Sequence, residues 1–532
     1  MKLNYLWVEE FKNLKNFEVD LSGAAEEPCT VILGRNGLGK SNLLEVLVVI
    51  FRDLYLGNAS HFWYRLRYTI GQGRTHISIE NQPRTSSANS IFSFDVTNHE
   101  GKSTRHPLYA FKSTKRVPDP LGWNFLPRHV FAYYSGPSDR LEEHFRPHQK
   151  KFYDDLLQGK ENPFRPLFYA RPVHSNFVLL AFYTKTDPTI TNFLRERLRI
   201  EGFQSALFVL HKPPWADRRP DGDPRFWRAF GTVQRFLAKL WKVAIAPMTL
   251  SGAIPDMFGK AHPTQFKYLL VPGLAALREL AEKSASAVDL FKELESTYIS
   301  KLIHETRIRV QIRDHNGSLT FRELSEGEQQ LLTVVGLLRF TKESESLFLL
   351  DEPDTHLNPA WGMEYLEILK EIAGVVGDSQ ILIATHDPLM LAGLLKEQVI
   401  VLERDPSGSR IVAEHPEVDP RGMGVSGILK SSMFGLSTTL DLPTQEKLDE
   451  RFRLYAKGNR THAEQQRLID LSDELANAGF AQDFRDDNYS RFARAVATLR
   501  KENKLILSRS EIADLDARAL AAVRETMNED AN

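Results

Sequence analysis

Alternating apolar and polar side chains predict a pair of β-strands at the start of this chain. The alternation runs from Leu3 to Leu21 and is interrupted by a polar turn at residues 12–16, which is typical of two strands joined by a turn. A continuous apolar run at Thr30–Leu33 indicates a short buried strand. Residues 41–54 then change to a helical period. One face of that helix carries Leu43, Leu44, Leu47, Val48 and Phe51.

Further apolar segments predict additional strands along the chain. Tyr64–Glu80 and Ser90–Asn98 read as an antiparallel meander, and His129–Gly136 as a strand that ends in a turn. Residues 346–350 and 381–385 are apolar except for Ser346 and Thr385, as expected for buried strands of an α/β sheet.

The middle and the end of the chain are predicted to be mixed and mainly helical, respectively. Predicted helices in the middle cover Thr191–Ile200, Pro224–Val243 and about Ala275–Ile303. A strand at Arg307–Arg313 follows. From Asp441 the chain reads as successive helices, one of which opens with a capping box at Thr461–Glu464.

Length and composition indicate an ordinary globular protein with more than one folding unit. The chain has 532 residues, of which 42% are hydrophobic and 26% charged. No apolar run is long enough to span a membrane, and no signal peptide is recognised. The single cysteine, Cys29, allows no internal disulfide. We therefore expect a cytoplasmic protein without membrane contact.

Charge is distributed unevenly although the net charge is only -1. Residues 101–240 contain 24 Lys and Arg against 13 Asp and Glu, an excess of 11 positive charges, so the remainder carries about -12. This basic segment interleaves arginines with aromatic residues. They are Arg195, Arg197, Arg199, Arg218, Arg219, Arg225, Arg228 and Arg235, with Phe193, Trp215, Phe226, Trp227 and Phe230. Contact with DNA or RNA is one interpretation; a solvated face over a small aromatic core, or a protein-docking surface, is the other.

A glycine-rich loop follows the strand at Thr30–Leu33 and has the form G-x-x-x-x-G-K-S of a phosphate-binding loop (Walker A). Its backbone N–H groups and the following helix N-terminus favour phosphates. Lys40 is expected to reach the β- and γ-phosphates, and the Ser41 hydroxyl to hold Mg²⁺. The candidate ATP-binding residues here are Gly34, Asn36, Gly37, Gly39, Lys40, Ser41 and Asn42.

Two later strands end in residues that complete a nucleotide site. The apolar strand before Asp351 and Glu352 offers one carboxylate for the Mg²⁺ shell and one to polarise the attacking water. The strand at residues 381–385 delivers His386 to its carboxyl end, where ligands bind in open α/β sheets. His386 is therefore a candidate γ-phosphate contact.

The segment Leu324–Gln330 resembles the ABC-type signature in the form found in the RecF, SMC and OLD group of ATPases. Phe11–Leu14 also resembles that group. The resemblance covers about residues 1–60 and 305–402, and it implies that two heads face each other as a homodimer or a higher oligomer. It further implies that Ser325, Gly327 and Glu328 of one head close over the ATP–Mg²⁺ of the other. The glutamine that the family places between the first two motifs is not identifiable, and Gln72 is not assigned.

The resemblance implies an α/β fold, an ABC-type P-loop ATPase head interrupted by a basic mixed insertion and followed by a helical C-terminal extension. The expected parts are an N-terminal lobe (1–136), the insertion (137–300), a C-terminal lobe (301–405) and a helical partner-docking extension (406–532). The C-terminal lobe contains the signature, the strand that ends in Asp351 and Glu352 (Walker B) and His386.

Residues 133–140 and 422–436 resemble a narrower family, the PtuA ATPases of bacterial anti-phage systems of the Septu type and of some retrons. That resemblance implies an ATPase controlling a separate HNH nuclease, with a reverse transcriptase–nucleic acid complex as a further partner. No nuclease pattern is found in the chain itself; Asp514–Asp516 reads as part of a helix. The alternatives are a RecF-like DNA-repair or chromosome-maintenance ATPase, a transporter ATPase subunit, and a scaffold that binds ATP without hydrolysing it.

Overall fold

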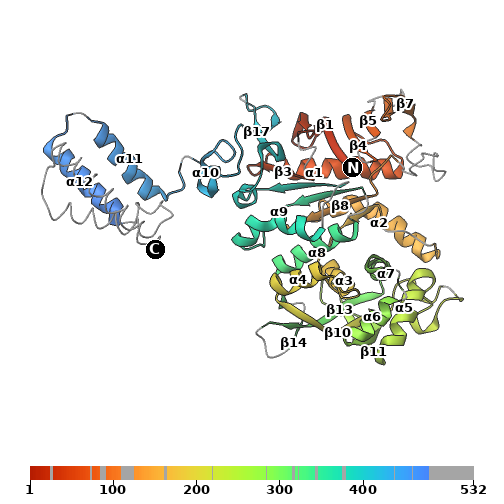
Figure 1. Ribbon diagram of the computed structural model, residues 1–532. Coiled ribbons are helices and arrows are strands. Elements are labelled where there is room, and N and C mark those ends of the chain that lie inside the picture. Colours follow the sequence, from red (N-terminus) through yellow and green to blue (C-terminus); the bar gives the residue numbers. More distant parts are fainter. Residues whose placement is uncertain are drawn as a thin grey trace, which may run out of the picture. The chain divides into compact units, whose positions relative to one another are not determined.

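In the computed structural model, the chain divides into two units, residues 1–436 and 437–532 (Figure 1). The larger unit contains all of the nucleotide-binding motifs. The structure describes residues 1–23, 28–71, 75–83, 91–108, 125–160, 165–218, 220–282, 284, 286–313, 318–320, 323–341, 345–373, 379–405, 407–436, 438–457 and 459–477. Gln72, Arg219 and Asp514–Asp516 lie outside the described residues.

A seven-stranded sheet forms the centre of the larger unit. Its order is β18-β17-β3-β16-β15-β8-β9, and only the edge strand β18 is antiparallel. The strands are β3 (Cys29–Gly34), β8 (His129–Tyr134), β9 (Leu167–Tyr169), β15 (Ser346–Asp351), β16 (Gln380–Thr385), β17 (Val399–Arg404) and β18 (Ile411–Glu414). The strands predicted around residues 30, 130, 348 and 383 are thus confirmed and lie side by side. The fold is α/β.

Each face of this sheet packs against a different core. In β3, Ile32 points into one core while Val31 and Leu33 point into the other, because successive side chains of a strand alternate. The first core also contains helix α1 (Lys40–Leu56), whose side chains at Leu43, Leu44, Leu47, Val48 and Phe51 are buried as predicted.

An antiparallel six-stranded sheet lies on the α1 side (Figure 1). Its order is β2-β1-β4-β5-β6-β7. The strands are β1 (Lys2–Phe11), β2 (Leu14–Asp20), β4 (Tyr64–Ile70), β5 (Thr75–Gln82), β6 (Ile91–Thr97) and β7 (Ser103–His106). The predicted N-terminal strand pair and the meander are therefore confirmed.

Helices cover the opposite face of the central sheet. They are α3 (Val173–Phe182), α7 (Ala287–Ile299), α8 (Glu326–Thr341) and α9 (Pro359–Ala373), whereas α2 (Glu142–Leu157) places Phe145 in the core around α1. Helices α3 and α8 approach closely because Gly336 has no side chain: a Cβ there would lie 2.2 Å from Val178 Cγ1. Helix α8, which opens within the signature segment, is thereby fixed against the head.

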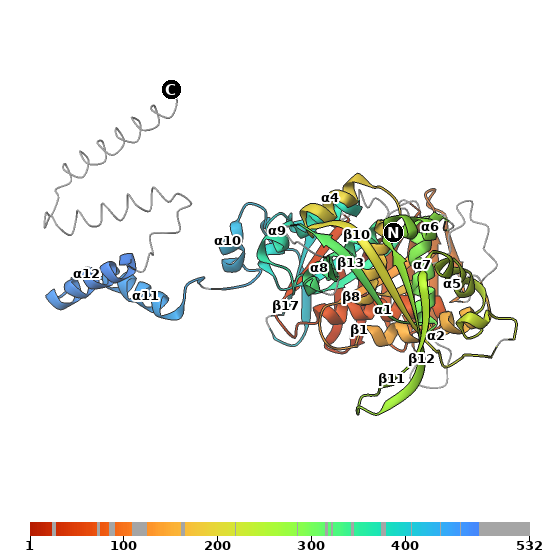
Figure 2. The same ribbon diagram turned by 90° about the horizontal axis from the view of Figure 1, so that it is seen from below.

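The middle of the chain adds a third sheet, which is antiparallel and has the order β11-β12-β10-β13-β14. Its strands are β10 (Ile200–His211), β11 (Ile245–Pro255), β12 (Ala261–Pro272), β13 (Ile303–Ile312) and β14 (Ser318–Thr320), with helices α4 (Pro188–Glu196), α5 (Gly231–Val243) and α6 (Gly273–Glu282). Figure 2 shows β11 and β12 as a long hairpin. This hairpin was not predicted from the sequence.

Three helix predictions in the same region need correction. Helix α4 ends at Glu196, and Ile200 already begins β10. The predicted helix at Pro224–Val243 is interrupted, because Trp227 and Arg228 adopt positive φ angles between η2 (Pro224–Phe226) and α5. The single helix predicted from Ala275 consists of two, α6 and α7, and the Ser286 hydroxyl caps the second by accepting from the Asp289 N–H.

The larger unit ends with η4 (Pro388–Leu391), η5 (Lys396–Gln398) and α10 (Gly424–Lys430). In the smaller unit, α11 (Leu442–Ala456) packs on α12 (His462–Asn477). Thr461 and Glu464 form the predicted capping box. None of the helices in the described ranges combines the length and apolar character needed to cross a bilayer.

A buried ionic cluster joins the edge of the central sheet to its helical layer. Glu295 of α7 accepts from the Arg165 guanidinium and lies 2.8 Å from His174 Nε2 of α3. The Arg171 N–H donates to His174 Nδ1, so His174 Nε2 carries the proton given to Glu295. Despite burial, which opposes ionisation, His174 and Arg165 hold the pKa of Glu295 at about 2. The cluster links α3, α7 and the segment before β9.

We expect Glu295→Gln to lower the free energy of unfolding by about 3–5 kcal/mol near neutral pH, because Arg165 then remains buried without its counter-ion. The folded-state pKa of Glu295, about 2, lies below its ordinary value of 4.5. The stabilisation is therefore complete above about pH 4.5 and is lost as the pH falls toward 2. Urea unfolding across this range should show a steeper acid loss in the parent protein than in Glu295→Gln. Equal pH dependence in both would contradict this assignment.

Candidate nucleotide-binding site

The parallel register brings the ends of four strands to the same level. Asp351 of β15 pairs with Tyr134 of β8 on one side and with Ala384 of β16 on the other. Ala384 in turn pairs with Ile32 of β3. The glycine loop and the residues that follow Asp351 and Thr385 therefore leave the sheet along one edge, although they are far apart in sequence.

The phosphate-binding loop leaves β3 at Gly34, where a side chain would be crowded by Leu402. A Cβ at Gly34 would lie 3.0 Å from the Leu402 carbonyl oxygen. Gly37 and Gly39 have φ angles of 84° and 88°, which L-residues rarely adopt. Asn36 is exposed at the tip of the loop. The chain then enters α1 at Lys40, so the predicted strand–loop–helix unit is confirmed.

The turn between β1 and β2 packs against this loop and forms a hydrogen bond with it. Asn13 Nδ2 donates to the Gly37 carbonyl at 2.8 Å, and Asn42 Nδ2 donates to Asn13 Oδ1 at 2.6 Å. A Cβ on Gly39 would lie 2.9 Å from both Asn13 Oδ1 and Leu14 Cδ2. The lack of a side chain at Gly39 therefore permits the contact between the turn and the loop.

Lys40 is buried beneath the loop. Its Nζ donates to the Gly34 carbonyl at 2.8 Å. Burial lowers the pKa of Lys40, while the carboxylates of Glu352, Asp351 and Asp354 act in the opposite direction. The ammonium thus lies in an acidic pocket at the start of α1, where the helix N-terminus also favours anions.

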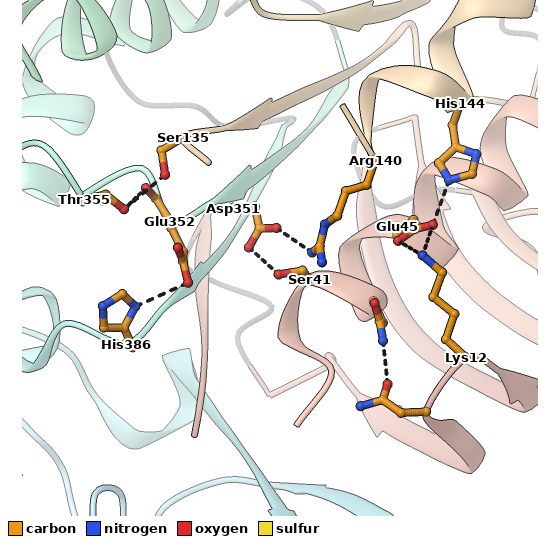
Figure 3. A network of polar contacts seen from close by, with 12 residues as sticks. Lys12, Ser41, Glu45, Ser135, Arg140, His144, Asp351, Glu352, Thr355 and His386 are labelled. Atoms are coloured by element: carbon orange, nitrogen blue, oxygen red, sulfur yellow. Dashed lines mark hydrogen bonds and ion pairs between the residues drawn. The ribbon is translucent and has the colours of Figure 1, made fainter. Parts of the chain in front are cut away.

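Ser41 and Asp351 meet at the centre of the site (Figure 3). Ser41 Oγ donates to Asp351 Oδ1 at 2.9 Å, and Arg140 Nη2 donates to Asp351 Oδ2 at 3.1 Å. Burial raises the pKa of Asp351 to about 6, against the lowering effect of Ser41, Arg140 and Lys40. A hydroxyl and a carboxylate are oxygen ligands of the kind that Mg²⁺ prefers. The residues present therefore fit a magnesium ion held by Ser41 and Asp351.

Glu352 occupies a strained backbone position at the same edge. Its φ is 52°, unfavourable for a residue with a side chain. Two hydrogen bonds hold it there: its N–H donates to the Ala384 carbonyl at 2.8 Å, and its carbonyl accepts from Thr355 Oγ1 at 3.0 Å. His386 Nδ1 lies 3.4 Å from Glu352 Oε1. The two candidate catalytic residues are therefore neighbours.

The signature segment opens helix α8 with its polar groups paired locally. Glu328 accepts hydrogen bonds from both the backbone N–H and the hydroxyl of Ser325, at 2.7 and 2.8 Å. A Cβ at Gly327 would lie 2.3 Å from the His356 carbonyl oxygen, and Gln330 Nε2 donates to the Pro353 carbonyl. The start of α8 is therefore anchored to the loop that follows Glu352.

Two separate cavities adjoin these motifs. One, of about 490 Å³, is lined by the phosphate-binding loop together with residues 401–404 and 432–434. The other, of about 770 Å³, is lined by residues 133–139, by Leu324, Glu326 and Gln329 near the start of α8, and by surrounding residues. They share no lining residue. Within one chain, the signature and the phosphate-binding loop thus face different spaces.

A polar network on the other side of α1 was not foreseen from the sequence. Glu45, buried in α1, accepts from Lys12 Nζ at 2.6 Å and lies 2.8 Å from His144 Nε2 of α2. Lys12 and His144 lower the pKa of Glu45 against the effect of burial. The network ties the turn before β2 and helix α2 to α1 (Figure 3). In the sequence, only the presence of Lys12 in the Phe11–Leu14 segment hinted at it.

The basic middle segment is more self-contained than its composition suggested. Arg225 pairs with Asp223, Arg195 with Glu201, and Arg197 with Glu364. Arg228 donates to the Pro220 carbonyl, and Arg235 to Thr232. The interleaved aromatic residues Phe193, Trp215, Phe226 and Trp227 are buried in the core. These contacts favour a solvated face over an aromatic core, and nucleic-acid contact remains a prediction.

Together, the parallel sheet, the glycine loop and the acidic strand end define an ABC-type P-loop ATPase. A family described as "AAA domain, putative AbiEii toxin, Type IV TA system" matches residues 29–392. Because this match covers more than half of the chain, the protein belongs to that family. ATP and Mg²⁺ are the ligands generally used by ATPases of this kind.

Within the family, the chain is related to PtuA. It is 28% identical over 200 residues to the Septu protein PtuA of Bacillus mycoides (strain KBAB4), covering 35% of this chain and 27% of that protein. It is also 28% identical over 168 residues to the Septu protein PtuA of Bacillus thuringiensis, covering 29% of this chain and 41% of that protein. The matches thus span less than half of either relative.

Solved structures with a detectable likeness include SMC heads. The SMC head domain from Thermotoga maritima is 13% identical, with a TM-score of 0.31, over 79% of this chain and 100% of that one. An Smc head bound to the C-terminal domain of ScpA, derived from Pyrococcus furiosus, is 13% identical, with a TM-score of 0.29, over 78% of this chain and 96% of that one.

We expect Gly39→Ala to destabilise the nucleotide-free protein more than Gly37→Ala. Both glycines have positive φ, so each substitution carries a similar strain of roughly 1–2 kcal/mol. Only the Gly39 methyl group would contact Asn13 and Leu14, whereas the Cβ position at Gly37 is open. Chemical unfolding of both variants measures the difference. Equal destabilisation would show that the contact between the turn and the loop is loose.

Proposed function

We propose that this chain binds and hydrolyses ATP with Mg²⁺ between two facing copies and thereby controls a separate effector in anti-phage defence. The observation that carries this proposal is the arrangement of Lys40, Ser41, Asp351, Glu352 and His386 along one edge of a parallel sheet. Phosphate-binding, metal-binding and proton-accepting groups are thereby brought together.

Each group in this arrangement has a role that suits its chemistry. The loop N–H groups and Lys40 hold the phosphates, and Ser41 and Asp351 hold Mg²⁺, which neutralises charge on the phosphate oxygens. Glu352 accepts the proton of the attacking water. His386, which lies beside Glu352, contacts the γ-phosphate. The positive φ of Glu352 is a backbone conformation of the kind that clusters at functional sites.

The signature supports a site shared between two copies. Ser325 is exposed, and in its own chain the signature lies at a cavity other than the one beside the phosphate-binding loop. A second copy can present Ser325 and Gly327 to the γ-phosphate, with the N-terminal end of α8 directed at the anion. We infer a dimer of heads in which each signature closes the other copy's site.

Glu352→Gln should lower the ATP turnover number by about 10²–10⁴-fold, because the amide cannot accept the proton of the attacking water. Nucleotide binding should persist, since Glu352 is not among the phosphate-holding groups. Phosphate release measures turnover, and sedimentation with ATP should reveal a persistent dimer. Lys40→Ala serves as the control that fails to bind nucleotide. Unchanged turnover in Glu352→Gln would remove this residue from its assigned role.

Co-expression of two inactive variants tests the shared site. Lys40→Ala disables the phosphate-binding loop, and Ser325→Arg disables the signature. A mixed dimer keeps one intact site, built from the loop of one copy and the signature of the other. Random pairing should therefore restore about a quarter of the parent ATPase activity. If the signature acted within its own chain, no mixed dimer would contain an intact site, and activity would stay absent.

The role in defence rests on the relatives named PtuA and on residues 133–140 and 422–436, which resemble that family. We propose an HNH nuclease as the controlled effector, with a reverse transcriptase–nucleic acid complex as a further partner where such a gene adjoins. The Glu352→Gln protein, held in its ATP-bound state, is suited to capture of the native complex. Mass spectrometry should then identify a nuclease; its absence from complexes with both ATP-bound and nucleotide-free protein would contradict this assignment.

A further inference from the structure

Arg140 is the one arginine seen to pair with Asp351 in the described part of the chain. Its Nη2 lies 3.1 Å from Asp351 Oδ2, and the Asp351 side chain is fully buried. Ser41 Oγ occupies the other carboxylate oxygen at 2.9 Å. Both oxygens of this carboxylate are therefore engaged in the structure described.

Arg140 makes few contacts besides its pairing with Asp351. Its side chain is 32% exposed, and the guanidinium lies over the Tyr134 ring at 5.3 Å. The Arg140 Nε atom is buried and lacks a hydrogen-bond partner. The anchor of Arg140 is thus a single ion-pair hydrogen bond and a ring face, rather than a bidentate pair.

The position of Arg140 in the chain makes it sensitive to the nearby loop. It lies between Tyr134, which pairs with Asp351 in the sheet, and the start of α2 at Glu142. Ser135 Oγ lies 3.1 Å from Thr355 Oγ1, on the loop that follows Glu352 (Figure 3). Residues 135–140 therefore contact the loop that follows Glu352 and supply the guanidinium that pairs with Asp351.

We propose that Arg140 is a positioning residue that neutralises Asp351 before the metal arrives and yields this carboxylate to Mg²⁺ when ATP–Mg²⁺ binds. The inference rests on the proposed ATPase function. The guanidinium and the metal compete for the same buried carboxylate, and a released guanidinium lies beside an anionic nucleotide. Loading of the metal is thereby coupled to movement of residues 135–140.

The test compares Arg140→Gln with Arg146→Gln in the full-length chain. Arg146 lies six residues further on, in α2, and pairs with Asp139 and Glu143 instead of Asp351, so its variant removes an equal charge without freeing Asp351. Binding of a fluorescent ATP analogue is followed as Mg²⁺ is titrated. Arg140→Gln should lower the Mg²⁺ concentration at the midpoint about fivefold, because its competitor is gone. Arg146→Gln should leave the midpoint unchanged, and Arg140→Lys should restore it toward the parent value.

Thermal unfolding in EDTA without nucleotide provides a second readout. Arg140→Gln should lower the melting temperature in the parent background, where Asp351 loses its partner, and have a smaller effect in an Asp351→Asn background. An unchanged or raised Mg²⁺ midpoint, or equal melting shifts in both backgrounds, would overturn the inference while leaving the ATPase proposal intact. If the parent protein bound no ATP with Mg²⁺, the proposed function and this inference would both be overturned.

Discussion

Parallel pairing of strands that are distant in sequence is the constraint on which the rest of this structure depends. Residue Asp351 stands level with Tyr134 and Ala384, and Ala384 stands level with Ile32. A slip of one residue in any of these pairs would turn that strand's side chains to the opposite core. The two separate apolar cores, one around α1 and one around α8, prevent such a slip. The geometry of the site is thus fixed by the packing of two apolar cores that extend far beyond the site.

That packing also explains how the site tolerates an unfavourable charge distribution. Lys40 and Asp351 are both buried. Burial lowers the pKa of Lys40 and raises the pKa of Asp351, so it favours the neutral form of each. Removing charged groups from water is costly unless partners compensate. Here Gly34, Ser41 and Arg140 supply those partners. Lys40 is suited to bind a phosphate anion and Asp351 a divalent cation. We therefore infer that these ligands replace some of the present partners of Lys40 and Asp351 when they bind.

The sequence predicted the parts of the site that depend on neighbouring residues. The run Thr30–Ser41 specifies strand, loop and helix locally, and the apolar strand before Asp351 ends where its acidic residues begin. The contribution of Arg140 could not be foreseen, because its contact with Asp351 exists only after β8 and β15 pair. The hairpin of β11 and β12 was missed because its first strand is exposed along almost all of its length, so it lacks the apolar alternation of a half-buried strand. The interruption at Trp227 and Arg228 was missed because positive φ angles are uncommon for residues with side chains, and neither residue type signals one.

The place of β3 in the sheet has a consequence for synthesis of the chain. Its two neighbours, β16 and β17, begin only at Gln380 and Val399. On a ribosome that adds about 5–20 residues per second, β3 waits on the order of 20–70 s for its first partner. During that interval a largely apolar strand has both edges open, a state prone to wrong pairing. The interval also delays function, because the Ser41–Asp351 contact spans 310 residues. A nascent chain therefore cannot assemble this site until most of its length has been translated.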